Sequence, residues 1–190
     1  MAKYIEGQEF HGIRYAPDAM SMLEFEQCRF TDCDFSACNF MGVTFIDCVF
    51  DRCNFRAAKL NHTALRNASF MECDLSQVNF AMIDKTIFEV SFTRCVLRYA
   101  QFYGLRLSGM SFKSCDLVAA DFMSVKLEKS GFAGCDLHQT VYLQADLRGA
   151  DFSSARNYTI DPSKNKMKGA RFSREGLPGL LAQTGVRITV

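Results

Sequence analysis

The cysteines are the residues whose chemistry would matter most if this sequence brought them together. The 190-residue chain has nine of them, and Cys33-Asp34-Phe35 begins a pattern that returns at Cys53, Cys73, Cys95, Cys115 and Cys135, at intervals of 20 or 22 residues. Zinc needs four ligands that converge tetrahedrally, whereas a fixed repeat lines its side chains up in rows. We therefore interpret the cysteines as small buried hydrophobic residues and expect no metal, no cofactor and no disulfide framework.

No other catalytic arrangement is evident from the spacing. His11, His62 and His138 are far apart in the repeat, and there is no glycine-rich phosphate loop and no paired-carboxylate site. One acidic set does recur on a single face, which we name the acidic column: Asp34, Asp74, Asp116 and Asp136. Its carboxylates either bond to the backbone at the corners or bind a partner. An enzyme is not expected.

The elements that position these residues follow a period of five. Large apolar residues, here called centres, recur at Phe10, Tyr15, Met20, Phe25, Phe30 and onward to Phe80, then from Ile87 to Phe152 after a two-residue slip within 81–85. Neither a helix, with its period of 3.6, nor a strand, with its period of 2, would gather such residues on one side. A coil that turns a corner every five residues would.

The residue two positions before a centre is usually small. All nine cysteines occupy this position, as do Ala58, Ala68, Ala100, Ala120, Ala145 and Ala150. Both positions are therefore predicted to face inward, which gives the cysteines a packing role.

This pattern resembles the pentapeptide-repeat family, whose consensus is a small residue, Asp or Asn, Leu or Phe, and two mostly polar residues. Ala120-Asp121-Phe122, Ala145-Asp146-Leu147 and Ala150-Asp151-Phe152 match it closely. The resemblance implies an all-β fold, a right-handed quadrilateral β-helix in which four pentapeptides form one coil. Every fourth centre from Phe10 to Phe172 is indeed phenylalanine once the slip is allowed for, as four sides require.

The chain divides into residues 1–155, the β-helix, and 156–190, a final coil with a short capping helix and a tail. Ser173–Thr184 is predicted as the helix, with Ser173 as N-cap and Gly185 after its end. The open end of a repeat rod needs a cover. The apolar residues here exceed what one cap needs, so we predict a homodimer through Leu177, Leu180, Leu181, Val186 and Ile188.

One outer side is unusually apolar. Its outward positions include Met22, Met41, Met82, Tyr103, Met123, Val141 and Leu143. A continuous exposed apolar stripe marks a contact surface, and methionine suits adaptable contacts. The alternative is that these corner side chains are half covered by the stack.

Composition excludes several classes of protein. The formal net charge is +1, so the chain is not a uniformly basic nucleic-acid binder, and we expect no direct nucleic-acid contact. Residues 1–80 hold eleven acidic and seven basic residues, whereas 81–190 hold ten and fifteen. No segment approaches a membrane span, and no signal peptide precedes the repeats, so we expect a soluble cytoplasmic protein.

The C-terminal part is similar to the subgroup that includes quinolone-resistance (Qnr) and microcin-immunity proteins. The shared features are the Asn-Tyr-Thr-Ile-Asp-Pro loop at 157–162 and the spacing of Gly176, Leu177, Leu180, Leu181, Gly185, Val186 and Ile188. This resemblance implies a dimer that binds DNA gyrase or topoisomerase IV and protects it from inhibitors, in some members by mimicking DNA. The alternative is a general protein-interaction scaffold that uses the methionine-rich side.

Overall fold

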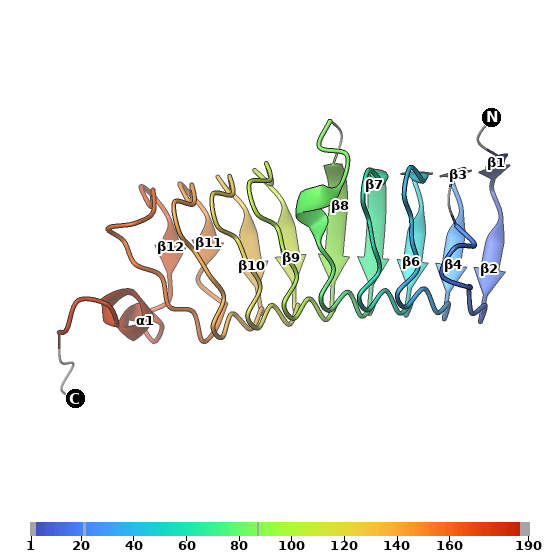
Figure 1. Ribbon diagram of the computed structural model, residues 1–190. Helices are drawn as coiled ribbons and strands as arrows, with labels where there is room; N and C mark the ends of the chain where they lie inside the picture. The colour runs from blue at the N-terminus through green and yellow to red at the C-terminus, as the bar shows by residue number, and fades with distance from the viewer. Residues whose placement is uncertain (1–2, 21, 87, 187–190) are drawn as a thin grey trace.

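Short parallel strands stacked in register build this protein, because each five-residue side of a coil finds its backbone partners in the coils above and below. The computed structural model describes residues 3–20, 22–86 and 88–186. They form a rod, with the N-terminus at one end and a short helix at the other (Figure 1). The expected all-β, four-sided β-helix with a short C-terminal capping helix is confirmed.

Nine strands form one continuous path through the sheet, and three more lie beside it. The elements are β1 (Lys3–Glu6), β2 (Glu9–His11), β3 (Leu23–Glu26), β4 (Arg29–Thr31), β5 (Thr44–Ile46), β6 (Val49–Asp51), β7 (Ala64–Met71), the 3-10 helix η1 (Phe80–Met82), β8 (Phe88–Thr93), β9 (Ser111–Lys113), β10 (Gly131–Ala133), β11 (Asp151–Phe152), β12 (Arg171–Phe172) and α1 (Leu177–Leu181).

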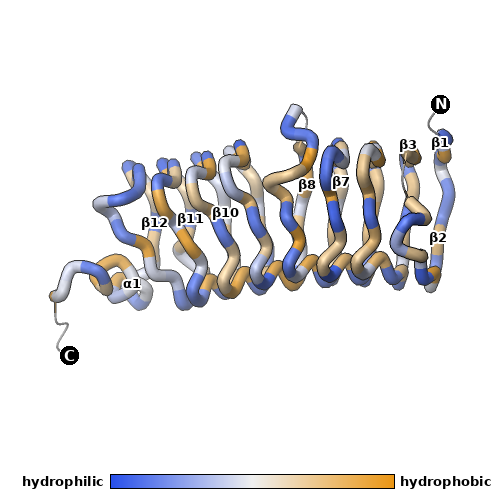
Figure 2. Tube along the Cα trace, in the orientation of Figure 1, coloured by the Kyte–Doolittle hydropathy of each residue, from blue (hydrophilic) through white to orange (hydrophobic). Residues whose placement is uncertain are grey.

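Each of the four faces is a column of centres, and we name it after a feature of its residues. The phenylalanine face runs through Phe10, Phe30, Phe50, Phe70, Phe92, Phe112, Phe132, Phe152 and Phe172, and the cysteine face through Tyr15, Phe35, Phe55, Leu75, Leu97, Leu117 and Leu137. The methionine face runs through Met20, Phe40, Leu60, Phe80, Phe102, Phe122 and Tyr142, and the loop face through Phe25, Phe45, Leu65, Phe88, Leu107, Leu127, Leu147 and Met167. Figure 2 shows hydrophobic and hydrophilic residues alternating along the coils.

Aromatic stacking fills the core along the rod. Phe10 and Phe30 stack with ring centroids 4.8 Å apart, and many rings of the N-terminal coils meet a ring on the next face edge-on, as Phe30 meets Phe35 at 71°. Such pairs add about 0.5–1.5 kcal/mol to the area term of about 1.5–3 kcal/mol for burying each side chain. Stability therefore accumulates coil by coil.

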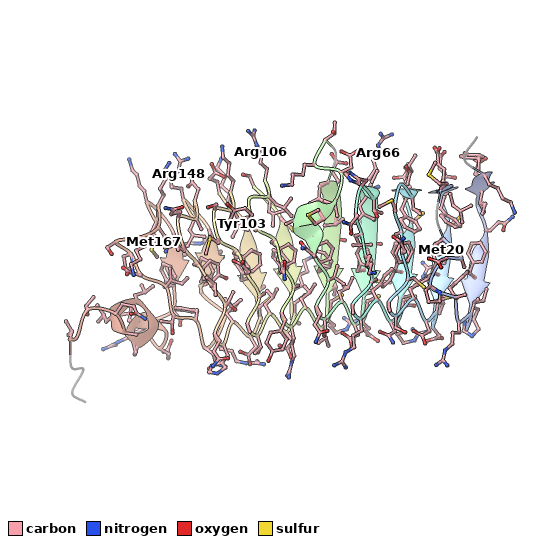
Figure 3. The ribbon with its side chains drawn as sticks, in the orientation of Figure 1. Met20, Arg66, Tyr103, Arg106, Arg148 and Met167 are labelled. Carbon is pink, nitrogen blue, oxygen red and sulfur yellow. The ribbon has the colours of Figure 1, made fainter. Side chains whose placement is uncertain are left out.

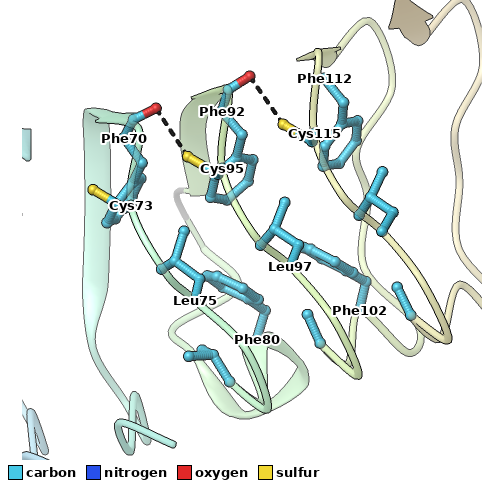
Figure 4. Close-up of a cluster of buried hydrophobic side chains, with 14 of the residues drawn as sticks. Phe70, Cys73, Leu75, Phe80, Phe92, Cys95, Leu97, Phe102, Phe112 and Cys115 are labelled. Carbon is cyan, nitrogen blue, oxygen red and sulfur yellow. Dashed lines mark hydrogen bonds between the residues drawn. The ribbon is translucent and has the colours of Figure 1, made fainter. Parts of the chain in front are cut away.

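The second inward position holds a small hydrogen-bond donor in many coils. The Cys95 thiol donates to the Phe70 carbonyl oxygen at 3.3 Å, and the Cys115 thiol to that of Phe92 at 3.6 Å (Figure 4). Thr63 and Thr140 make the same contact with their hydroxyls, to Phe40 and Leu117 at 2.9 Å. All nine cysteines are buried free thiols, which confirms their predicted inward position.

The register changes on the loop face. The His62 N–H still bonds to the Met82 carbonyl, and Ile83 is buried, so the 20-residue spacing continues beyond Met82. The next strand pairs Leu65 with Phe88. The predicted centre Ile87 lies outside the described residues. Exposed Asp84, Lys85 and Thr86 belong to the projecting slip loop near β8 in Figure 1.

The C-terminal cap is shorter than predicted from the sequence. Helix α1 covers only Leu177–Leu181, with Gly176 as N-cap, and the Ser173 hydroxyl accepts a bond from the Gly176 N–H at 3.1 Å in the preceding turn. Tyr158, rather than Asn157, turns into the core. A Cβ added at Gly176 would meet the Tyr158 hydroxyl, and one at Gly179 the Tyr158 carbonyl. The two glycines therefore let the cap close directly on this ring.

Tyr142 is a polar exception in the core. It continues the column of aromatic rings, 5.5 Å from Phe122, but its buried hydroxyl has no hydrogen-bond partner. Burial raises the pKa of this phenol well above its ordinary value, so it stays neutral. An unpaired buried hydroxyl destabilises a fold by about 1–3 kcal/mol.

We predict that Tyr142→Phe raises the free energy of unfolding by about 1–2 kcal/mol, because it removes the unpaired hydroxyl and keeps the ring. For a chain of this length, this is a rise of roughly 2–8 °C in melting temperature, measurable by calorimetry. The matched control is Tyr15→Phe, at a half-buried centre near the N-terminal end, which we expect to change stability by less than about 0.5 kcal/mol. A loss of stability in Tyr142→Phe would contradict the prediction.

Candidate functional site

The inside of the rod is filled, so any function lies on its outer faces. Burial raises the pKa of the Cys48 thiol to about 12 and also raises those of Cys33 and Cys38, which keeps these thiols protonated and unreactive at neutral pH. Across residues 3–20, 22–86 and 88–186, no three His, Cys, Asp or Glu side chains gather where they could hold a metal ion.

The acidic column forms a row along the cysteine face. Parallel bridges link Asp34 to Asn54, Asn54 to Asp74 and Asp116 to Asp136, with Val96 between Asp74 and Asp116. In each acidic residue, one carboxylate oxygen accepts the backbone N–H two residues later. The acceptors and donors are Asp34 and Ser36, Asp74 and Ser76, Asp116 and Val118, and Asp136 and His138, at 2.9–3.2 Å. These carboxylates therefore fix the corners of the coils.

Arginines neutralise three of the four carboxylates. Arg14 Nε lies 2.9 Å from Asp34, Arg98 Nε 2.6 Å from Asp116, and Arg156 Nε 3.2 Å from Asp136. Arg14 and Arg156 stand at the two ends of the column, in the same outward position as the acids, 20 residues away. The pairing of Arg14 with Asp34 and of Arg156 with Asp136 can be seen when the sequence is written in rows of twenty residues. The five-residue motif alone does not show it.

Hydrogen bonds lower the pKa of two of these carboxyls. The Ser36 N–H, followed by the Ser36 hydroxyl and Arg14, lowers the pKa of Asp34. At Asp136, burial acts to raise the pKa, but bonds from Asn157, the His138 N–H and Arg156 outweigh it and leave the pKa lowered. Both groups are therefore charged at neutral pH, and their charge is already partnered within the chain.

A shallow hollow interrupts this face at its middle, where Val96 replaces an acid. Its volume is about 380 Å³, and Arg56, Asp74, Arg98 and Tyr99 are among the residues that line it. Tyr99 is more than half exposed. Sequence reasoning missed Tyr99, because a corner position in the repeat gives no sign of how far a side chain stands out.

The methionine face exposes most of the predicted stripe. Met22 is 65% exposed and Tyr103 51%, while Met41, Met82 and Val141 are exposed by 42–49%. Met123 and Leu143 are only half-buried members of the same row. The side chains lie on corners whose backbone is fixed by turn bonds, such as that from the Met41 N–H to Asn39 Oδ1 at 3.2 Å. The stripe is therefore rigidly mounted, and exposed Lys59, His62 and Gln101 of the same face lie between its apolar side chains.

The predicted dimerisation residues separate into two groups. Leu177, Leu181 and Val186 are exposed, whereas Leu180, also in the capping helix, is partly buried and packs against the core. Ile188 lies outside the described residues. The cap thus presents apolar side chains at the C-terminal end of the rod.

None of the helices in the described part of the chain has the length and apolar character needed to cross a membrane.

Comparison with known proteins gives a family and a fold. A family model described as a pentapeptide repeat region matches residues 20–102, 43–122 and 85–163, three overlapping stretches that together span most of the chain. No curated protein matched the sequence.

Two of the similar solved structures are trypsin-treated variants of QnrB1, a plasmid-mediated fluoroquinolone resistance protein. The first is 15% identical, with a TM-score of 0.64, over 98% of this chain and 100% of that one. The second is 17% identical, with a TM-score of 0.53, over all of both chains. At this identity the likeness shows the shared fold.

We predict that Asp34 stabilises its corner through the oxygen that accepts the Ser36 N–H, more than through charge. Asp34→Ala should lower the free energy of unfolding by about 1 kcal/mol at pH 7, whereas Asp34→Asn, which keeps an acceptor oxygen, should lose less. Because the folded pKa is lowered, the charge contribution is present above the unfolded pKa of about 3.9 and is lost as pH falls through the folded value.

Urea unfolding at pH 7 and at pH 3 measures both effects. The difference between wild type and Asp34→Asn should shrink at the lower pH. Equal destabilisation by Asn and Ala at pH 7 would show that the turn bond is not the main contribution.

Proposed function

This chain belongs to the pentapeptide-repeat family, and from that membership and its outer faces we propose that it is a non-enzymatic protein-binding solenoid. Stacked apolar side chains fill most of the interior, and in the described part of the chain no three His, Cys, Asp or Glu side chains gather where they could hold a metal ion. Rigid columns at a fixed spacing of about 4.8 Å suit recognition of a protein surface.

The observation that carries this proposal is the exposed apolar row on the methionine face. Five side chains, Met22, Met41, Met82, Tyr103 and Val141, are exposed by 42–65% on one side of the rod. An exposed apolar row of this kind typically marks a contact surface, and tyrosine is enriched among the residues that dominate interface energetics.

The proposed partner is a type II topoisomerase, DNA gyrase or topoisomerase IV, which the protein would protect from inhibitors. The fold likeness to QnrB1 over the whole chain supports this partner. The resemblance of the sequence at 157–162 and 176–188 to the Qnr subgroup supports it as well. We propose contact through the methionine face rather than DNA mimicry by the acidic column, because arginines neutralise three of its four carboxylates. With this partner we propose a cytoplasmic location, and nine free thiols are compatible with its reducing environment.

The second candidate is a general interaction scaffold that uses the same face for another protein. The exposed row supports it equally, since apolar contacts do not specify the partner. A direct topoisomerase assay separates the two candidates.

We predict that the purified protein restores gyrase supercoiling in the presence of a fluoroquinolone, and that Met41→Glu combined with Tyr103→Glu reduces this protection at least tenfold. Two charges on an apolar contact surface oppose its desolvation. The measurement is the protein concentration that gives half-maximal recovery of supercoiled plasmid.

The matched control is Ser111→Glu combined with Ala133→Glu. It adds the same charge at two exposed positions of the phenylalanine face. It should protect as well as wild type. Absence of gyrase binding and of protection by the wild-type protein would refute the topoisomerase proposal, and equal loss in both variants would refute the assignment of the methionine face.

We also propose a homodimer through the C-terminal end, and predict that Leu177→Arg combined with Leu181→Arg converts it to a monomer. Both side chains are exposed, at 45% and 36%, so the substitution should leave the melting temperature of the rod nearly unchanged. Light scattering after size-exclusion chromatography gives the mass. A wild-type monomer, or a double variant that remains a dimer, would contradict this assembly.

A further inference from the structure

The C-terminal half of the loop face carries a row of cations, which we name the basic strip. It consists of Arg106, Lys126, Lys129, Lys166 and Lys168, all exposed. Parallel bridges place Arg106 beside Lys126, Lys126 beside Asp146 and Asp146 beside Lys166. Figure 3 shows Arg106 and Arg148 projecting from the same edge of the rod.

Arg148 binds the two carboxylates that lie within this strip, those of Asp146 and Glu128. It bonds to both oxygens of Asp146, at 2.7 and 2.6 Å, and to Glu128 at 3.1 Å. The Ser108 hydroxyl donates a further bond to Glu128 at 2.6 Å. In the described part of the chain, none of the five strip cations has an ion pair of its own. The strip therefore presents unneutralised positive charge on a rigid surface.

A hollow of mixed lining adjoins the strip beside β8. Its volume is about 390 Å³; Phe88, Val90, Leu107 and Met110 form its apolar part, and Asn67, Glu89, Ser91, Arg106 and Ser108 its polar part. A neighbouring hollow of about 360 Å³ shares Phe88, Glu89 and Arg106 with it. Arg106 thus belongs both to the strip and to the hollows. Because Glu89 lines both hollows, an anionic group is better placed along the strip than inside them.

The strip is short and bounded. Arg106 and Lys166 are three coils apart, which is about 14 Å at strand spacing. The slip loop near β8 separates the strip from the N-terminal coils of the same face (Figure 1), which carry exposed Arg66 and then the acids Asp47, Glu26 and Glu24. A long polyanion lying along the rod would meet these acids, whereas a short anionic segment would not.

We propose that the basic strip and the adjoining hollow bind a short acidic segment of a partner protein, with an apolar side chain of that segment in the hollow. Charge complementarity selects the acidic residues, and the hollow beside Phe88 selects the apolar one. A single-stranded nucleic acid is less well matched, because the strip coils at 105–110, 125–130, 145–150 and 165–170 contain no aromatic residue on which bases would stack.

This inference deepens the proposed protein-binding function by naming the chemistry of the partner segment. The experiment uses the full chain and a fluorescein-labelled peptide of one leucine followed by five glutamates, with no topoisomerase present. Its failure would therefore leave the supercoiling assay, which tests the methionine face, unaffected.

Fluorescence anisotropy should show saturable binding that weakens as salt rises. Lys126→Glu combined with Lys166→Glu should weaken binding at least tenfold. The control, Lys59→Glu combined with Lys113→Glu, makes the same change in net charge at exposed positions of two other faces and should change binding less than twofold. Replacing the leucine of the peptide by glycine should weaken binding about threefold or more.

Three results would overturn the proposal. If the control variant weakened peptide binding as much as Lys126→Glu with Lys166→Glu, the attraction would be general and not due to the strip. If the glycine peptide bound as tightly as the leucine peptide, the hollow would not be part of the binding site. Tighter binding of a short DNA duplex than of the peptide, lost in Lys126→Glu with Lys166→Glu, would assign the strip to nucleic acid instead.

Discussion

Hydrogen bonding between successive coils is the constraint on which the rest of this structure depends. The Phe35 N–H bonds to the Asn54 carbonyl above it at 2.7 Å, and the Asn54 N–H bonds back to Cys33 at 2.9 Å. Turn bonds within a coil, such as that from the Cys38 N–H to the Phe35 carbonyl, close only the corners, and the remaining backbone groups find partners in the adjacent coils, so every coil must lie in register on its neighbour. Side chains of corresponding positions then stack directly over one another, inside and outside. The aromatic columns, the thiol-to-carbonyl bonds and the rows of surface charge are all consequences of this one arrangement.

The same constraint explains why the sequence predicts most of the fold. Two of every five positions must fill a narrow interior, so Cys95 and Leu97 are identifiable as inward residues from their spacing alone. The prediction is weaker where the period breaks. Tyr158 enters the core one position later than the repeat implies, because the chain there leaves the coil to meet the cap, and Gly176 and Gly179 accommodate its ring. The register shift likewise ends later than the predicted residues 81–85. Ile83 is still buried at the 20-residue spacing, and the next strand pairs Leu65 with Phe88.

The outer faces were less predictable, because the repeat does not constrain what an outward side chain contacts. The acidic column is recognisable from the sequence, but its neutralisation depends on arginines from neighbouring coils, such as Arg14 beside Asp34. Exposure of the methionine row was anticipated only as one of two alternatives, and the structure divides it: Tyr103 stands out, whereas Met123 lies half covered. A position in the repeat fixes the direction of a side chain, while its length and its neighbours decide how much of it a partner can reach.

Stacking also determines how charge can be arranged on such a rod. Residues in one column are about 4.8 Å apart, so like charges in adjacent coils repel unless a neighbour intervenes. On the cysteine face, arginines intervene and little free charge remains. On the loop face, Arg148 serves Asp146 and Glu128 and leaves Arg106 and Lys126 adjacent and unpaired. Because Arg148 binds the carboxylates nearest to these cations, an external anion would complement the positive charge that remains on this face.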